Sequence, residues 1–499
     1  MSFKVSFIGA GSIGFTRNLI RDLLAVGEFN DVEIALMDIS EQNLDMVRQL
    51  VERDIRENGL DAVKLTATTD QREAVEGARY VMNVARVGGV DAFVHDIEIP
   101  LKYSVDQCVG DTLCAGGIMY GQRGIPMILN LCLDIQEVAE EDCIILNYAN
   151  PNAMMTWAAN EFGGVYTLGL CHGVQGGHAQ IADVLGIPRE ELDFICAGIN
   201  HQTWYIQLLH NGEDMTGKVL EAFENHEEFS QTEKVRIDML RRFGYYSTES
   251  NGHLSEYVPW YRKRENEIKD WIATDCWIQG ETGGYLRIIT EGRNWFETDF
   301  PNWMKEPPFE FKSEKRSQEH GSYIIESLET GRLYRGHFNV VNGGCITNLP
   351  EDAIVEVPCY VDANGINIPI VGDLPMGCAA VCDVSINVQR LAVHAAVYGD
   401  DTLLRQAMMM DPLTGAVCNP PEIWQLVDDM LIAQAEWLPQ YADAISVAKE
   451  RQKTAERIPT RDDYRGAVRF KTKTIEEMAK DKEATRKTTA ASDKAGMTE

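Results

Sequence analysis

Two side chains suited to metal binding, Cys171 and His201, each follow an apolar stretch that is typical of a β-strand. A thiolate and an imidazole together favour a soft or borderline divalent metal ion. A structural zinc site would need four such ligands, whereas a catalytic site keeps positions open for water or substrate. Either residue alone is more often a buried cysteine or a core histidine, so only the pair predicts a metal centre.

A glycine-rich turn near the N-terminus, GAGSIG, has the spacing of a dinucleotide-binding motif. It follows the apolar stretch FKVSFI, precedes an amphipathic helix pattern, and is followed by a second strand pattern that ends at Asp38. In such a turn the glycines Gly9, Gly11 and Gly14 serve the tight turn, the approach to the pyrophosphate and close helix–strand packing. Ser12 opens the helix, and Asp38 would accept ribose hydroxyls and repel a 2′-phosphate, which favours NAD over NADP. The alternative is a glycine turn in an unrelated α/β protein.

Further polar residues lie close in sequence to these motifs. His172 adjoins the candidate ligand Cys171, so we expect function there, whereas His178 has no such neighbour. Asp111, in GDTLCAGG, is either a turn-forming residue or a carboxylate aimed at the site. The surrounding glycines indicate a backbone that closely approaches another part of the molecule.

A third patch combines His253, Glu256 and Tyr257 at helical i, i+3, i+4 spacing. These residues could remove a proton from a substrate, or they could form an aromatic packing patch. A serine hydrolase has no support, because the chain lacks a GxSxG motif.

The elements that position these residues alternate between strand and helix patterns. Strand patterns over 3–8, 32–38, 63–68, 79–85, 143–148 and 165–170, separated by helix patterns, predict an α/β fold. We expect a Rossmann-like doubly wound sheet of the lactate/malate dehydrogenase type over 1–200. A mixed α+β domain for substrate binding and oligomerisation is predicted over 201–445, and a charged C-terminal tail over 446–499. In open α/β sheets ligands bind beyond the carboxyl ends of the strands, which is where NYANP and CHG fall.

The composition limits the classes of partner. The 499 residues carry a formal net charge of -31, which disfavours binding to nucleic acid or to an anionic membrane. We see neither a run of 18 apolar residues nor a signal peptide, so the sequence predicts a cytoplasmic protein with no membrane association. The 12 cysteines are scattered singly, as expected in a reducing compartment.

The motif order resembles glycoside hydrolase family 4, the NAD- and manganese-dependent glycosidases. The resemblance is carried by FIGAGSIGF, the acid in LMDI, GDTLCAGGI, LNYANPNAM, LGLCHG, AGINH and VEVPCYVDANGI, which span roughly residues 3–370. TESNGHLSEYVPW and NPNAMMTWA are similar to the α-galactosidases of melibiase type within this family.

The resemblance implies NAD+ and Mn2+, or another divalent metal, as cofactors. In the family, C3 of the sugar loses a hydride to NAD+, a base removes the C2 proton, and the glycosidic oxygen leaves by elimination. Water then adds at C1 and the hydride returns. The metal acts as a Lewis acid on the sugar oxygens, and the family is an exception to the two-carboxylate scheme of glycosidases.

By position, the resemblance assigns Cys171 and His201 to the metal, the GAGSIG turn and Asp38 to NAD, Asn150 to the sugar, and Asp111 to an acidic position near the site. Relatives that cleave phosphosugars have Asp or Asn after the metal cysteine. His172 occupies that position here, which implies a role in substrate contact or leaving-group departure and a non-phosphorylated substrate. The C2 base is left open between His253 and Tyr257.

The predicted function is hydrolysis of α-galactosides of the melibiose or raffinose type. Within the family the alternatives are an α-glucosidase or an α-galacturonidase. From another class, a 2-hydroxy-acid dehydrogenase would produce net NADH and ignore chelators, and an NAD-binding sensor would turn over no sugar. Relatives imply a homodimer or homotetramer.

Overall fold

The first half of the chain forms a parallel sheet. A computed structural model describes residues 2–273 and 277–481. Its first six strands pair in parallel in the order β3-β2-β1-β4-β5-β6, which is the dinucleotide-binding order. Their bounds are Lys4–Ile8 (β1), Glu33–Met37 (β2), Lys64–Thr68 (β3), Tyr80–Asn83 (β4), Ile144–Asn147 (β5) and Thr167–Leu170 (β6). The predicted Rossmann-like sheet is therefore confirmed.

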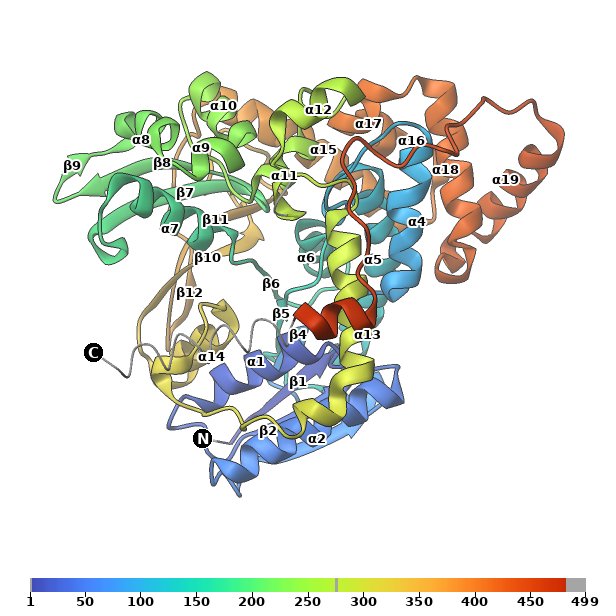
Figure 1. Cartoon of the computed structure of the whole chain (residues 1–499). Helices are drawn as coiled ribbons and strands as arrows, with labels where there is room; N and C mark the ends of the chain where they lie inside the picture. The colour runs from blue at the N-terminus through green and yellow to red at the C-terminus, as the bar shows by residue number, and fades with distance from the viewer. Residues whose placement is uncertain (1, 274–276, 482–499) are drawn as a thin grey trace.

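The helices that follow these strands cover the sheet (Figure 1). They are α1 Ile13–Leu24, α2 Glu41–Glu57, α3 Gln71–Val75, α4 Gly89–Lys102, α5 Cys114–Val138, α6 Asn152–Glu161 and α7 Gly173–Leu185. The glycine-rich stretch after Asp111 forms the start of α5. A Cβ on Gly116 would lie 2.6 Å from the carbonyl oxygen of Gly110, and one on Gly117 would overlap the backbone of Thr112. These glycines let the loop before α5 fold back tightly onto the helix.

The second half of the chain extends the same sheet in antiparallel fashion. β10 (Tyr334–Val341) pairs with β6 and β11 (Ile354–Asp362), and β11 pairs with β7 (Leu192–Ile199) and β12 (Gly365–Asn367). β7, β8 (Gln202–His210) and β9 (Glu213–Asp214) complete the antiparallel part. The twelve strands found in the described residues thus form one sheet, and the mixed α+β half is continuous with the Rossmann-like half.

Helices of the second half pack on the antiparallel strands and on the helices of the first half. They are α8 Val219–Asn225, α9 Phe229–Thr232, α10 Lys234–Phe243, α11 Asn251–Tyr257, α12 Glu265–Trp271, α13 Gly284–Trp303, α14 His320–Thr330, α15 Met376–Tyr398, α16 Asp401–Met410, α17 Pro412–Val417, α18 Pro420–Ala433 and α19 Ala442–Thr454. Of these, α15 is terminated by Gly399, which adopts a φ of 65°, and α16 begins at Asp401. No helix of the described residues is long and apolar enough to cross a membrane.

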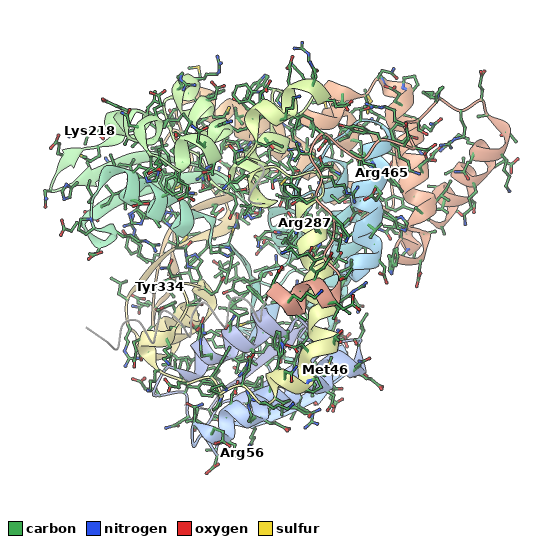
Figure 2. All side chains as sticks on the ribbon, in the orientation of Figure 1. Met46, Arg56, Lys218, Arg287, Tyr334 and Arg465 are labelled. Atoms are coloured by element: carbon green, nitrogen blue, oxygen red, sulfur yellow. The ribbon has the colours of Figure 1, made fainter. Side chains whose placement is uncertain are left out.

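Two segments whose structure the sequence did not reveal run side by side. In Figure 1 the last described residues, coloured red, lie along α13. Figure 2 labels Arg287 of α13 and Arg465 of this C-terminal segment on the same side of the molecule, while Met46 and Arg56 mark the opposite end. Hydrogen bonds join the two segments, including one from the Thr282 amide to the Val468 carbonyl. Residues 455–481 therefore pack on their own chain.

Candidate active site

The glycine turn is fastened to the end of β2. The amides of Gly9 and Ala10 both donate to the Met37 carbonyl, at 2.9 and 2.8 Å. The Asp38 carboxylate accepts the Gly11 amide at 2.7 Å through one oxygen and the Ser40 amide at 2.8 Å through the other. Because a carboxylate has about four acceptor positions, Asp38 retains lone pairs for ribose hydroxyls.

The start of α1 has room for a ligand. Ser12 precedes the first turn, but its hydroxyl makes no capping hydrogen bond. A Cβ on Gly14 would meet no atom within 4 Å, so the expected helix–strand packing does not explain this glycine. The helix start offers unpaired amides and open space at Gly14, which fits the phosphates of a dinucleotide.

The predicted metal ligands lie together at the junction of the two halves. Cys171 directly follows β6, and His201 occupies the turn between β7 and β8 with a φ of 61°. Both are buried, and Glu249 joins them. Its carboxylate oxygen Oε2 lies 3.4 Å from the Cys171 sulfur and 3.5 Å from Nε2 of His201. One donor atom from each residue lies within 4.8 Å of the others.

Glu249 was not singled out from the sequence. It lies in the loop before α11, 48 residues from His201 and 78 from Cys171, so no spacing rule joins the three. The available signal was its place in TESNGHLSEYVPW, one of the motifs that carry the family resemblance. The chain therefore supplies a thiol, an imidazole and a carboxylate, a donor set that suits a divalent cation with open positions.

A second group of donor atoms shares His201. Asp111, His201 and His253 also have donor atoms within 4.8 Å of one another. The Thr112 hydroxyl lies 2.9 Å from Nδ1 of His201 and 2.9 Å from the Asp111 carboxylate, to which it donates. The Asn150 amide donates to the other Asp111 oxygen at 2.9 Å. The Asp111 carboxylate therefore links Asn150, the sugar candidate, through Thr112 to His201, the metal candidate.

The electrostatics of this group favour a bound cation. Burial raises the pKa of the Cys171 thiol well above its usual range, and the Glu249 carboxylate adds to the effect. Burial also works against ionised Glu249, but the neighbouring His201 and His253 lower the pKa of Glu249 to about 2. A divalent ion would convert the thiol to a thiolate and balance the carboxylate, so the residues fit a metal of the predicted kind.

The three α11 residues His253, Glu256 and Tyr257 differ in what they contact. His253 is buried with Nδ1 2.6 Å from the Ser250 hydroxyl, and burial lowers the pKa of His253 to about 4, which keeps the imidazole neutral. The Tyr257 hydroxyl is buried and has no hydrogen-bond partner in the described part of the chain. Glu256 points elsewhere, because its carboxylate accepts the amides of Cys108, Val109 and Gly110 at 2.7–3.1 Å. His253 lies in the donor group, with the centroid of the Tyr257 ring 5.9 Å from that of its own ring, and Glu256 supports the loop before α5.

His172 pairs with Glu319 and makes no hydrogen bond to the donor group in the described residues. Its imidazole Nδ1 lies 3.2 Å from a Glu319 oxygen, and its side chain is 63% exposed. The Glu319 hydrogen bond raises the pKa of His172 to about 9, so a protonated imidazolium is favoured at neutral pH. His178, by contrast, lies 2.8 Å from the Leu192 carbonyl and stacks near Phe194, which is a structural arrangement.

Arg86, which the sequence did not bring forward, follows β4 close to the glycine turn. Its guanidinium lies over the rings of Tyr120 and Tyr285 at 4.7 and 5.3 Å and donates to the Tyr285 hydroxyl at 3.2 Å. Its Nη1 is buried with no hydrogen-bond partner in the described residues. Arg86 is therefore a candidate donor to a bound ligand.

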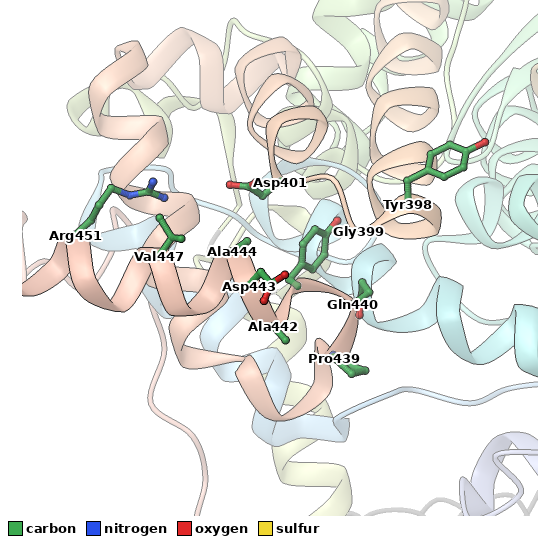
Figure 3. Close-up of a pocket in the computed structure, with 11 residues that line it drawn as sticks. Tyr398, Gly399, Asp401, Pro439, Gln440, Ala442, Asp443, Ala444, Val447 and Arg451 are labelled. Carbon is green, nitrogen blue, oxygen red and sulfur yellow. The ribbon is translucent and has the colours of Figure 1, made fainter.

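One surface hollow lies away from all of these residues. It has a volume of about 640 Å³ and lies between the end of α15 and the start of α19, where Figure 3 shows Tyr398, Asp401, Gln440 and Val447 around it. None of the predicted site residues lines it. The chemistry belongs to the strand ends and not to this hollow.

The Rossmann-type sheet, the open glycine turn and the Cys171–His201–Glu249 group define a dinucleotide-binding enzyme fold with a candidate metal centre on the same sheet. Residues 4–187 match the sequence model of the family described as "Family 4 glycosyl hydrolase". Residues 196–414 match the model described as "Family 4 glycosyl hydrolase C-terminal domain". The chain belongs to glycosyl hydrolase family 4.

Individual relatives agree with this assignment. An alpha-galactosidase of Rhizobium meliloti is 58% identical over 484 residues, which cover 97% of this chain and 98% of the relative. An alpha-galactosidase of Bacillus subtilis is 34% identical, covering 88% and 99%. The structure of a 6-phospho-alpha-glucosidase from gut microorganisms in complex with NAD and glucose-6-phosphate superimposes with a TM-score of 0.72 at 25% identity, covering 88% and 99%.

Proposed function

We propose that this protein is an α-galactosidase that hydrolyses α-galactosides of the melibiose or raffinose type and requires NAD+ and a divalent metal such as Mn2+. The high identity to an alpha-galactosidase along nearly the whole chain supports the substrate class. The observation that carries the proposal is the meeting of an open dinucleotide turn with the Cys171–His201–Glu249 group at one end of one sheet.

The residues that would hold the two groups are distinct. The amides at the start of α1 and the Asp38 carboxylate would hold the dinucleotide, while Cys171, His201 and Glu249 would hold the metal. When bound, NAD+ would supply reversible hydride transfer at C3 of the sugar, and the metal would supply Lewis-acid polarisation of the sugar oxygens.

We assign the removal of the sugar's C2 proton to a residue of α11. His253 is neutral at physiological pH. The Ser250 hydroxyl donates to the Ile278 carbonyl at 3.3 Å and can accept Nδ1–H of His253, which fixes the ring and leaves Nε2 as the unprotonated nitrogen. Burial raises the pKa of Tyr257 well above its usual range, which keeps its phenol protonated. We therefore assign the base to His253 and a hydrogen bond to a sugar oxygen to Tyr257.

The remaining residues bind the sugar and help the leaving group depart. Asn150, oriented by Asp111, contacts the sugar hydroxyls. His172 is exposed and cationic beside Glu319, so it can donate a hydrogen bond or a proton to the departing glycosidic oxygen. A neutral side chain at position 172 would leave that oxygen without this donor.

The proposal is tested with a panel of aryl α- and β-galactosides, α-glucosides and α-galacturonides, with NAD+, Mn2+ and thiol each omitted in turn. We expect α-galactoside hydrolysis that is lost without either NAD+ or metal, and no net NADH from 2-hydroxy acids. Hydrolysis that persists after both groups are removed would exclude the redox mechanism. Faster hydrolysis of α-galacturonides than of α-galactosides would show that the proposed substrate class is wrong.

Two further expectations concern the protein as a whole. We propose a cytoplasmic homodimer or homotetramer. The eleven cysteines among the described residues are buried and form no disulfide, as suits a reducing compartment. Light scattering coupled to size-exclusion chromatography would measure the oligomeric state, and a monomeric mass would contradict it.

A further inference from the structure

The segment after α19 docks against the loop that carries Asp111. Residues 461–473, here called the C-terminal strap, begin with the Arg461 amide, which donates to the Lys102 carbonyl at 2.8 Å. Further along, the amides of Phe470 and Lys473 donate to Glu281 and Glu291 at 3.2 and 2.8 Å. The strap lies beyond residue 414, where the match to the family's C-terminal domain ends.

The strap completes the surroundings of one buried carboxylate, Asp106. Arg262 pairs with Asp106, and the Thr282 hydroxyl contacts both carboxylate oxygens at 2.8 and 2.9 Å. Two more donors come from the strap, namely the Ala467 amide at 2.8 Å and the Tyr464 hydroxyl at 3.3 Å. Asp106 is fully buried, so these hydrogen-bond and ion-pair partners replace the water that it lacks.

Asp106 is the first residue of a loop, 106–112, that ends in the active site. Next to it, the Gln107 carbonyl accepts the Gly283 amide at 2.8 Å. In the middle of the loop three successive amides donate to the Glu256 carboxylate. At its end, Thr112 lies 2.9 Å from Nδ1 of His201. The loop is thus held along its whole length, with the strap at one end and His201 at the other.

We propose that Tyr464 and Ala467 are positioning residues that act through Asp106. By holding loop 106–112, they set the place of the Asp111 carboxylate and the Thr112 hydroxyl, and through Thr112 the orientation of the His201 ring. The inference rests on the proposed function of His201 and Asp111. It differs from a purely stabilising role, because release of the strap should alter metal binding and turnover more than it alters NAD+ binding at the glycine turn, which follows β1 and makes no hydrogen bond to the strap in the described residues.

The first test uses Gly466→Val in the full-length enzyme. Gly466 has a φ of 96°, and a Cβ there would collide with the Thr282 side chain, so the strap cannot dock unchanged. We expect faster hydrogen–deuterium exchange of the 106–112 amides. We also expect kcat to fall roughly 10- to 100-fold, as displacement of a catalytic group by about 1 Å does, with weaker Mn2+ binding and an unchanged NAD+ dissociation constant.

Arg457→Ala is the matched control. Arg457 lies just before the strap and pairs at 2.7 Å with Asp429 on α18, which also accepts a hydrogen bond from the Tyr103 hydroxyl, and Arg457 makes no hydrogen bond to loop 106–112 in the described part of the chain. This variant should leave loop exchange, Mn2+ affinity and kcat unchanged. A loss equal to that of Gly466→Val would mean that general damage to the C-terminal segment explains both.

A second pair of variants, at Thr282, tests the proposal if Gly466→Val does not fold. Thr282→Val removes the hydroxyl that donates to Asp106 and accepts the Val468 amide of the strap at 3.4 Å, and Thr282→Ser keeps it. We expect the valine variant to lose turnover and Mn2+ affinity and the serine variant to retain both. Equal kcat and Mn2+ affinity in wild type and Thr282→Val would overturn the proposal.

The two proposals fail in different ways. Wild-type enzyme that hydrolyses α-galactosides without NAD+ or metal would overturn the proposed function, whatever the strap variants do. Unchanged exchange of loop 106–112 in Gly466→Val and Thr282→Val would overturn the positioning proposal, whatever cofactors the wild-type enzyme requires.

Discussion

The Glu249 carboxylate oxygen Oε2 lies 3.5 Å from Nε2 of His201, whose other ring nitrogen lies 2.9 Å from the Thr112 hydroxyl. The imidazole is therefore held between an acid on one side and a hydroxyl on the other. This arrangement leaves Nε2 beside the two other donors of the Cys171 group. A metal ion bound there would be held by ligands from three separate parts of the chain.

Replacement of Glu249 tests this donor set. Glu249→Gln keeps the shape but removes the negative charge, so we expect the Mn2+ dissociation constant of the apo-enzyme to rise at least roughly 10- to 100-fold. Electron paramagnetic resonance of free Mn2+ measures it. Glu319→Gln, which alters the partner of His172 instead, is the control and should bind Mn2+ normally. Wild-type Mn2+ affinity in Glu249→Gln would remove Glu249 from the metal site.

The Thr112 hydroxyl is expected to orient a ligand without touching the metal. Thr112→Val loses both of its hydrogen bonds, to Asp111 and to His201, at nearly constant volume. Outer-shell changes of this kind cost about 10- to 100-fold in metal affinity or activity. Titration calorimetry with Mn2+ should show this loss in Thr112→Val and normal affinity in Thr112→Ser. Equal affinity of the valine and serine variants would show that the hydroxyl is dispensable.

The glycine turn permits a separation of folding from cofactor binding. Gly14→Ala places a methyl group in open space, so the apo-enzyme should be as stable as wild type or more stable by about 0.5–1 kcal/mol. The same methyl group should obstruct the dinucleotide and weaken NAD+ binding.

Gly11→Ala serves as the contrast, because its Cβ would lie 2.7 Å from the Asp38 carboxylate and should disturb the turn itself. Thermal unfolding and fluorescence titration with NAD+ measure both quantities. Normal NAD+ affinity in Gly14→Ala would show that the cofactor does not approach this part of α1.

Stability should fall in acid because His178 is buried in its neutral form. Burial lowers the pKa of His178 to about 4 from an ordinary value of 6.5. The unfolded chain therefore binds more protons between these two pH values, and the free energy of unfolding should decrease as the pH falls from 6.5 to 4. The full shift corresponds to about 3 kcal/mol.

Urea denaturation of the wild type and His178→Gln across this pH range checks the prediction. The variant has no titrating group at this position, so its unfolding free energy should depend less steeply on pH. Identical slopes in the two proteins would show that His178 titrates alike in the folded and unfolded states.

The sequence predicted what local patterns encode. The parallel strands, the GAGSIG turn and the meeting of Cys171 with His201 follow from strand patterns and from the rule that strand ends converge in an open sheet. The sequence did not predict Glu249 as a metal-ligand candidate, because only the tertiary fold brings its loop close to Cys171. The spacing of Glu256 and His253 predicted that both lie on one face of a helix. The Glu256 carboxylate instead accepts the amides of residues 108–110, because buried amides need hydrogen-bond acceptors.

The C-terminal segment shows a different limit of prediction. Its high charge and few large apolar residues suggested a tail, but its backbone amides and Tyr464 pair with carboxylates of the main body, such as Asp106 and Glu281. Composition reports how much apolar surface a segment can bury. It does not report whether hydrogen-bond acceptors elsewhere in the chain are placed to bind the donors of that segment.

The central claim is that a residue of this chain removes the proton from C2 of the sugar during cleavage. Hydrolysis of an α-galactoside in D2O, followed by NMR of the released galactose, tests it most directly. Because the proton taken by His253 exchanges with solvent, the account predicts deuterium at C2 of the product. Galactose that retains its original C2 protium throughout would contradict the elimination mechanism and the base assigned to α11.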